Sequence, residues 1–146
     1  MHIDMYTDGS CLKAHGSGGY AYVLIYDGRT TSYIRTASGS YRNTTNNRME
    51  MTAIIKGLQM LTKRCSVCVY TDSKMISDMF NKHIIDKWVE CHFRRDKKLK
   101  NEDLWRNLLN ETGRHDITFI HVKGHSGNLM NDMCDKLAYE AAKNIE

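Results

Sequence analysis

Hydrophobic positions recur with two different periods along the chain, and each change of period marks an expected change of secondary structure. Segments rich in β-branched and aromatic residues are typical of strands, whereas Met51, Ile54, Leu58 and Leu61 fall at helical spacing. The expected strands lie in residues 2–8, 18–41, 65–72 and 116–122, and the expected helices in residues 46–63, within 73–113 and after 127.

Turn residues support this division. Asp27-Gly28 is a favoured hairpin turn, which splits residues 18–41 into two antiparallel strands. Asn and Thr residues before the first helix are candidate caps. The last helix is expected to bury one face, formed by Met133, Leu137, Ala138 and Ala141. The order of elements predicts an α/β domain with a mixed sheet, and no proline or low-complexity linker divides residues 1–146.

Composition fits one globular domain. The chain has 146 residues, of which 41% are hydrophobic and 26% charged. No stretch approaches the ~20 apolar residues of a membrane span, and the first residues lack the pattern of an export signal. We therefore expect no membrane association and a cytoplasmic or nuclear location. The five cysteines, an odd number, are expected to be reduced thiols.

Charge is concentrated in one segment. Residues 82–100 hold seven basic and three acidic residues, a difference of +4 that equals the net charge of the whole chain. Trp88 and Phe93 lie within it and offer flat faces for sugars or bases beside cations for phosphates. The pattern alone fits a nucleic-acid-binding segment and a solvated lysine-rich loop equally well.

Two expected strands end in the same residues, Tyr-Thr-Asp, at Asp8 and at Asp72. If these strands are neighbours, the two carboxylates lie side by side at one edge of the sheet and repel unless a cation lies between them. A hard divalent ion such as Mg²⁺ suits such oxygen ligands. For either aspartate alone, a simple role in a turn is the more economical interpretation.

Two further acids have local explanations of their own. Glu50 fits the N3 position of a capping box with Asn47, and Asp135 lies early in the last helix, where the helix dipole favours a negative charge. These local roles do not explain why four acids are placed where they can converge at one edge of a single sheet.

Cysteine and histidine spacings suggest a competing metal site. Cys65 and Cys68, with His121 and His125, have the spacings of zinc ligands. In a strand, however, residues 65 and 68 point to opposite faces. The 52 residues between Cys68 and His121 also far exceed the spacing in a zinc finger. We do not expect these four residues to bind zinc.

Four motifs carry a family resemblance: YTDGSC, TNNRMEM, VYTDS and VKGHSGNLMNDMCDKLA, in this order. Together they closely resemble the type 1 ribonuclease H family over essentially the whole chain. The resemblance implies the ribonuclease H-like fold, an α/β fold whose mixed five-stranded sheet has three antiparallel strands, then two parallel ones, and is flanked by helices. It also implies one catalytic domain with a basic protrusion around residues 82–100.

The implied activity is hydrolysis of the RNA strand of RNA·DNA hybrids by two-metal-ion catalysis, leaving 5′-phosphate and 3′-hydroxyl ends. The implied cofactor is a pair of Mg²⁺ ions, for which Mn²⁺ can substitute. The matching metal ligands are Asp8, Glu50, Asp72 and Asp135, and the family's catalytic loop histidine matches His125. The two Tyr-Thr-Asp motifs are then halves of one metal site.

Implied substrate contacts fall on further positions. In the family, paired asparagines reach the minor groove, a threonine seats a DNA phosphate, and the protrusion holds the DNA strand by charge. The matching residues are Gly9, Ser10, Cys11, Thr45, Asn46, Asn47, Lys74, Lys87, Trp88, Arg94, Arg95, Lys97 and Lys98. Three departures affect substrate contacts: residues 13–16 replace Gly-Asn-Pro-Gly, Lys74 replaces a common glutamine, and the protrusion has fewer tryptophans.

Three alternatives stay open beside a free-standing hybrid nuclease. A non-cleaving hybrid-binding module is expected to have lost one of the four acids, and none is missing. A DNA junction nuclease of the same fold is disfavoured by the asparagines of the NNRMEM motif. The nuclease portion of a reverse transcriptase is disfavoured by the compact ends. We expect a monomer, because no heptad pattern indicates a dimer; association with replication proteins is left open.

Overall fold

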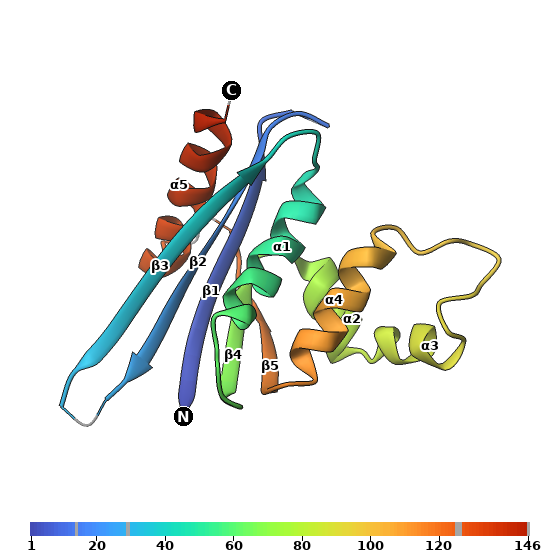
Figure 1. Cartoon of the computed structure of the whole chain (residues 1–146), viewed down its shortest axis with the longest axis horizontal. Coiled ribbons are helices and arrows are strands. Elements are labelled where there is room, and N and C mark those ends of the chain that lie inside the picture. Colours follow the sequence, from blue (N-terminus) through green and yellow to red (C-terminus); the bar gives the residue numbers. More distant parts are fainter. Residues whose placement is uncertain (14, 29, 125–126, 146) are drawn as a thin grey trace.

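The computed structural model describes residues 1–13, 15–28, 30–124 and 127–145, and in these the strands form one mixed five-stranded sheet (Figure 1). The strand order is β3-β2-β1-β4-β5, with β1 antiparallel to β2, β2 antiparallel to β3, and β4 parallel to both β1 and β5. This confirms the predicted fold class. The strands are β1 (His2–Cys11), β2 (Gly18–Asp27), β3 (Ser32–Tyr41), β4 (Ser66–Thr71) and β5 (Asp116–His121).

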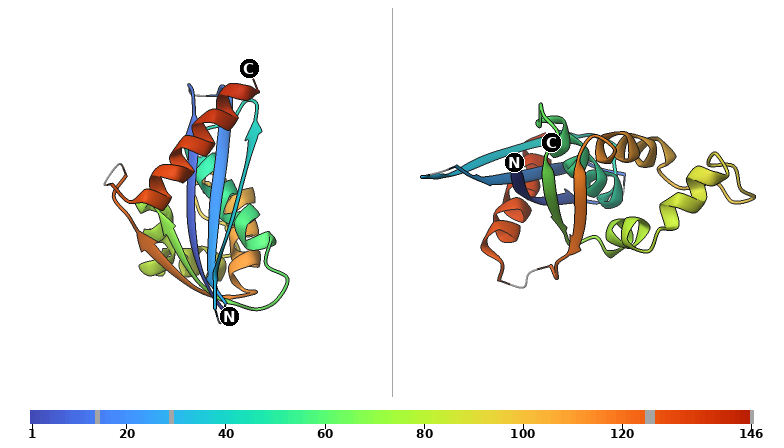
Figure 2. Two further views of the ribbon diagram at one scale, coloured as in Figure 1. Left: turned by 90° about the vertical axis from the view of Figure 1, so that its left-hand side faces the viewer. Right: turned by 90° about the horizontal axis from the view of Figure 1, so that it is seen from below.

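Helices cover both faces of the sheet (Figure 2). One face carries α1, which packs on β1 and β2 and against α4; α5 packs on β1, β2 and β3 from the other face. The short α2 packs beside β4 and β5. The helices are α1 (Asn46–Gln59), α2 (Lys74–Asn81), α3 (Ile84–Glu90), α4 (Glu102–Thr112) and α5 (Leu129–Asn144).

The middle of the chain is less helical than expected. Residues 73–113 contain three separate helices, and residues 91–101 between α3 and α4 form turns and irregular chain. Backbone φ angles of 54° at His92, 59° at Phe93 and 61° at Asn101 are left-handed and incompatible with a continuing right-handed helix. In Figure 1, α3 and this segment extend away from the sheet.

The core lies between the sheet and α1. Alternation along β1 turns Ile3, Met5 and Thr7 toward this core, where Met5 packs in one cluster with Ile54 and Leu58. Each fully buried apolar side chain stabilises the fold by roughly 1.5–3 kcal/mol. The side chains between these residues along β1 therefore point to the opposite face of the sheet. The candidate functional residues of β1, discussed below, are among them.

The buried face of α5 differs from the expected one. Ala138 is buried as predicted, but its buried neighbours are Cys134 and Ala142, and Met133 is 36% exposed. The helix backbone passes close to β2: a Cβ atom on Gly19 would lie 2.1 Å from the Ala138 carbonyl oxygen. Because the α5 backbone lies so close to β2, only small side chains fit between them. The helix is therefore rotated so that its larger side chains do not face the sheet.

No helix in the described ranges is both long enough and apolar enough to cross a membrane.

Candidate active site

Asp8 and Asp72 meet where β1 and β4 stop pairing. The last paired residues of the two parallel strands are Tyr6 and Tyr70, and each aspartate follows two residues later. The end of β1 was predicted wrongly: the strand continues past Asp8 to Cys11, because β2 still pairs with it there. Asp8 is thus held inside a strand, 3% exposed, while Asp72 is partly exposed.

Glu50 joins the two aspartates from α1. One carboxylate oxygen each from Asp8, Glu50 and Asp72 lies within 4.8 Å of the others, and these three residues are called the acid cluster below. The close approach of α1 to β1 requires Gly9, since a Cβ there would lie 2.3 Å from the Glu50 backbone nitrogen. Gly9 N–H also donates to Asp8 Oδ1 at 2.9 Å, which orients that carboxyl group.

The capping box considered for Glu50 is not formed. Thr45 caps α1, and its hydroxyl accepts a hydrogen bond from the Arg48 N–H at 3.2 Å. Asn47 is therefore the second residue of the helix rather than its cap. The carboxyl group of Glu50, 9% exposed, lies with the two aspartates instead.

Burial and mutual repulsion disfavour ionisation in the acid cluster. The pKa of Asp8 is raised to about 7, chiefly by burial and then by the charge of Asp72. Burial, followed by Asp8 and Asp72, raises the pKa of Glu50 well above its usual range. In the described part of the chain no N–H or O–H donor reaches Glu50 Oε2. Converging carboxylate oxygens, one of which has no donor, fit a hard divalent cation such as Mg²⁺.

Asp135 approaches the acid cluster from α5. Asn128 caps this helix, with its side-chain oxygen accepting from the Asn131 N–H at 3.0 Å. Asp135 is not a member of the acid cluster, but its carboxyl group is close enough to raise the pKa of Asp8 as well. The fourth predicted acid therefore borders the same site.

The loop before α5 passes Asp72. A Cβ atom on Gly124 would lie 3.3 Å from Asp72 Oδ2, and the His121 ring nitrogen Nε2 lies 3.2 Å from the Asp72 carbonyl oxygen. His125, the predicted catalytic histidine, lies outside the described residues.

The predicted groove contacts gather beside the acid cluster. The Cys11 N–H donates to Asn46 Oδ1 at 2.7 Å, which joins the end of β1 to the start of α1. Asn46 and Asn47 are exposed, and Gly9, Ser10 and Cys11 are partly exposed. The Thr45 hydroxyl, predicted to seat a phosphate, is engaged as the cap of α1.

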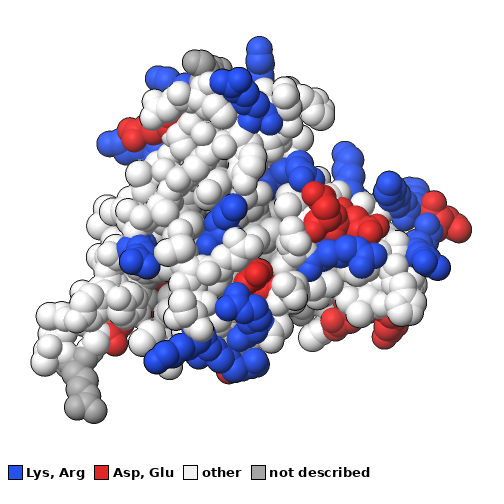
Figure 3. All heavy atoms as spheres, viewed as in Figure 1, with Lys and Arg blue, Asp and Glu red and all other residues white. Residues whose placement is uncertain are grey.

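The basic residues of the protrusion, residues 82–100, lie on a part of the chain that extends away from the sheet (Figure 1). Lys and Arg side chains gather over α3 and the irregular segment that follows it (Figure 3). Arg95 lies over the Trp88 ring at 4.7 Å and Arg106 over the Phe93 ring at 4.4 Å, so one face of each ring is covered. The predicted contact residues Lys87, Arg94, Arg95, Lys97 and Lys98 are all exposed.

Lys74 lies at the first position of α2, two residues after Asp72. Its side chain is 70% exposed and its Nζ lies 3.3 Å from Asp78 Oδ2 on the same helix. The pair is a surface contact that leaves the lysine accessible.

Of the four zinc-like positions, Cys65, Cys68 and His121 do not come together among the described residues, and His125 lies outside them. Cys65 is buried, and its N–H donates to His115 Nδ1 at 3.1 Å. Cys68 lies on the other face of β4, because Val67 and Val69 point into the core. The expectation that residues 65 and 68 point apart is confirmed.

Two contacts near the site were not predicted from the sequence, although Arg48 and Cys134 lie within the family motifs. Arg48 donates two hydrogen bonds to Asp103, at 3.0 and 2.8 Å, and one to Asn101, which ties the start of α1 to the start of α4. Cys134 is fully buried against the Tyr6 carbonyl oxygen, and burial followed by the Asp8 charge raises the pKa of its thiol to about 12. Because the thiolate is the reactive form, Cys134 is expected to be inert.

A sequence model of the family RNase H matches residues 1–143. The chain belongs to the RNase H family. A protein called Ribonuclease H from Lachnoclostridium phytofermentans is 45% identical over 146 residues, covering 97% of this chain and 92% of that protein. A Ribonuclease H from Syntrophus aciditrophicus is 46% identical over 142 residues, covering 96% of this chain and 80% of that protein.

Solved structures of RNase H proteins share the fold. LC9-RNase H1, described as a type 1 RNase H with the type 2 active-site motif, superposes with a TM-score of 0.88 at 27% identity, covering 98% of this chain and 72% of that one. LC11-RNase H1, solved in complex with an RNA/DNA hybrid, has a TM-score of 0.69 at 19% identity, covering 98% of both chains. The predicted family is confirmed.

Proposed function

We propose that this RNase H family member hydrolyses the RNA strand of RNA·DNA hybrids by two-metal-ion catalysis, leaving 5′-phosphate and 3′-hydroxyl ends. The observation that carries the proposal is the convergence of three buried or half-buried carboxyl groups within 4.8 Å, with Asp135 beside them. Relatives that are 40–46% identical and carry the name Ribonuclease H support it.

Asp8, Glu50, Asp72 and Asp135 would hold two Mg²⁺ ions, and Mn²⁺ fits the same oxygen ligands. When bound, a metal pair activates the attacking water and stabilises the leaving 3′ oxygen of an in-line displacement. The chain supplies a rigid frame for them, since Asp8 is oriented by the Gly9 N–H and Glu50 lies in the buried part of α1 that begins at Met49.

Other residues of the chain distinguish the substrate. Glu50 would sense the neighbouring 2′-hydroxyl, the group that separates RNA from DNA. Asn46 and Asn47, exposed beside the acid cluster, contact the minor groove. The exposed basic residues of the protrusion hold the DNA strand by charge. His125 moves a proton or aids product release, tasks that suit an imidazole.

The first experiment compares cleavage of one RNA strand that is hybridised to DNA, paired with RNA, or left single, in Mg²⁺ and in chelator. The variants are wild type, Asp8→Asn and, as a matched control, Asp116→Asn, which makes the same change at an exposed residue at the start of β5. We expect cleavage of the hybrid alone, dependent on metal, lost in Asp8→Asn and kept in Asp116→Asn. Binding of hybrid without cleavage in both Mg²⁺ and Mn²⁺ would identify a binding module instead.

A further inference from the structure

A second group of potential metal ligands lies at the opposite end of the β1–β4 pair from the acid cluster. His2 and Asp4 share a face of β1, and Cys68 on β4 pairs directly with Asp4 in the register of the parallel strands. This face is the one turned away from the core. The start of β1 is fixed there, since the Ser66 N–H donates to the Met1 carbonyl oxygen at 2.9 Å.

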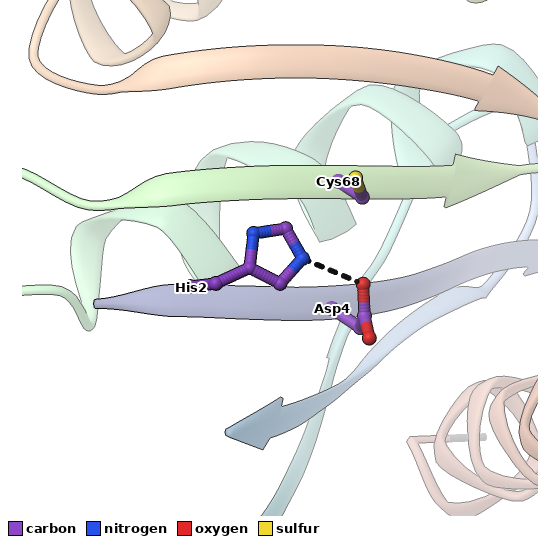
Figure 4. Close-up of side chains that lie close together, drawn as sticks. All are labelled: His2, Asp4 and Cys68. Carbon is purple, nitrogen blue, oxygen red and sulfur yellow. Dashed lines mark hydrogen bonds and ion pairs between the residues drawn. The ribbon is translucent and has the colours of Figure 1, made fainter. Parts of the chain in front are cut away.

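The three side chains lie close together, with the His2 ring pointing at the Asp4 carboxyl group and Cys68 beside them on β4 (Figure 4). One donor atom each from His2, Asp4 and Cys68 lies within 4.8 Å of the others, and His2 Nε2 lies 3.1 Å from Asp4 Oδ1. Around a tetrahedral zinc ion, such donors stand roughly 3.3–3.6 Å apart. The donor atoms therefore need to approach one another by at most about 1.5 Å to close the site.

Neighbouring groups orient two of the three donors. The second ring nitrogen of the histidine, His2 Nδ1, lies 3.1 Å from Ser66 Oγ, which leaves Nε2 directed at Asp4. The Tyr70 hydroxyl donates to Asp4 Oδ1 at 3.4 Å. In metal sites, histidine and carboxylate ligands are held in orientation by hydrogen bonds of this kind, which neighbouring residues make to them.

We propose that His2, Asp4 and Cys68 bind one Zn²⁺ ion, or a similar borderline-soft divalent cation, that joins β1 to β4. Imidazole nitrogen, thiolate sulfur and carboxylate oxygen are all zinc ligands, whereas Mg²⁺ is not a partner for sulfur. Three protein ligands leave the fourth tetrahedral position to water. Binding exchanges the S–H bond of Cys68 for an S–Zn bond and releases that proton to solvent.

The local environment is consistent with such an ion. Burial and the nearby Asp4 carboxylate raise the pKa of the Cys68 thiol, so a cation placed between them offsets the unfavourable charge. The His2 and Asp4 side chains are 51% and 38% exposed, which leaves a path for the ion from solvent.

The proposed zinc site is separate from the acid cluster. The stacked rings of Tyr6 and Tyr70, with centroids 4.4 Å apart, lie between them on the same two strands. Asp4 and Asp8 are four residues apart, or about 13 Å along an extended strand. The two sites therefore do not share ligands, and the test below needs no nuclease activity.

The test is a Co²⁺ titration of the full chain in excess Mg²⁺, without an N-terminal affinity tag, followed by the near-ultraviolet charge-transfer band that only thiolate-bound Co²⁺ gives. We expect one equivalent to saturate this band in wild type and in Asp8→Asn. Cys68→Ser should abolish the band, His2→Ala should weaken the affinity at least tenfold and Ser66→Ala about tenfold. The matched control Cys91→Ser, which changes a half-buried cysteine in the irregular segment after α3, should keep the band.

A second measurement uses the wild-type protein alone. Mass spectrometry of peptides follows the alkylation of each cysteine with and without one equivalent of Zn²⁺. We expect zinc to slow the alkylation of Cys68 at least tenfold and to leave that of Cys91 unchanged. A thiolate band that persists in Cys68→Ser, no such band in wild type, or equal alkylation of Cys68 with and without zinc would overturn the proposal and leave His2 and Asp4 as a surface ion pair.

Discussion

The acid cluster and the basic protrusion place their charges in opposite ways. The cluster brings carboxyl groups from β1, α1 and the end of β4 within 4.8 Å of one another, partly in the interior. The protrusion exposes its lysines and arginines on one short helix and one irregular segment that extends from the body. Chemistry on a phosphate needs fixed ligands, whereas attraction of a polyanion needs only positive charge at the surface.

The same difference appears in the energetics. Burial and repulsion make the acid cluster unfavourable by itself, as the raised pKa of Asp8 indicates. The cations of the protrusion are solvated and cost the fold little. Changes in the cluster should therefore alter both rate and stability, and changes in the protrusion should alter substrate affinity alone.

The largest expected effect is in the acid cluster. Asp8→Asn should lower the rate of hybrid cleavage by about a thousandfold or more, because a metal-ion effect is worth several kcal/mol. In metal-free buffer the same change should raise the free energy of unfolding, because it removes one of the mutually repelling carboxyl groups. Single-turnover cleavage measures the expected fall in rate, and urea unfolding measures the expected rise in the free energy of unfolding. Equal losses of activity and stability would show that the substitution had simply disrupted the fold.

The second expected effect is a pH dependence of stability. Asp8 binds its proton more tightly in the folded chain, with a pKa of about 7 against an unperturbed 3.8. Metal-free protein should therefore lose stability as pH rises from about 4 to about 7, by up to about 4 kcal/mol from this group. Added Mg²⁺ should then raise Tm more at pH 8 than at pH 5.

Comparison with Asp8→Asn isolates this effect. Burial lowers the pKa of His115, which acts in the opposite direction below about pH 6.5. The difference between the urea-unfolding curves of wild type and Asp8→Asn across pH cancels that contribution. Parallel pH profiles for the two proteins would contradict the assignment of the raised pKa to Asp8.

A smaller effect is expected in the protrusion. Lys97→Gln with Lys98→Gln should raise KM for the hybrid several-fold and leave kcat unchanged. The slope of log affinity against log salt should fall by up to about 2, since each lost phosphate contact removes a little under one unit. The matched control, Lys63→Gln with Lys143→Gln, removes the same charge from exposed residues outside the protrusion. A drop in kcat in the protrusion variant alone would indicate that these lysines also order the acid cluster.

The smallest effect concerns the contact between the two regions. Arg48 joins α1, which carries Glu50, to the start of α4, where the chain returns from the protrusion. Arg48→Ala should destabilise the fold by about 1 kcal/mol or less, because the pair with Asp103 is largely exposed. A double-mutant cycle with Asp103→Ala measures the coupling, and a coupling near zero would show that the contact does not hold the regions together.

Predictions from the sequence were accurate where the signal is local. Helical spacing from Met51 to Leu58 and the Asp27-Gly28 turn sufficed to place α1 and the β2–β3 hairpin. The end of β1 was missed, because the pairing of Cys11 with β2 has no signature in the residues that follow Asp8. The breaks within residues 73–113 were missed for a similar reason: apolar periodicity does not report a left-handed residue such as Asn101.

The sequence by itself determined the order of the elements, the family motifs and the identity of the four acids, because these depend on neighbours along the chain. Only the tertiary structure decided which face of α5 is buried and that Cys68 lies beside His2 and Asp4. The physical reason is that close packing and strand register join residues more than sixty positions apart, and no local pattern encodes which surfaces will meet.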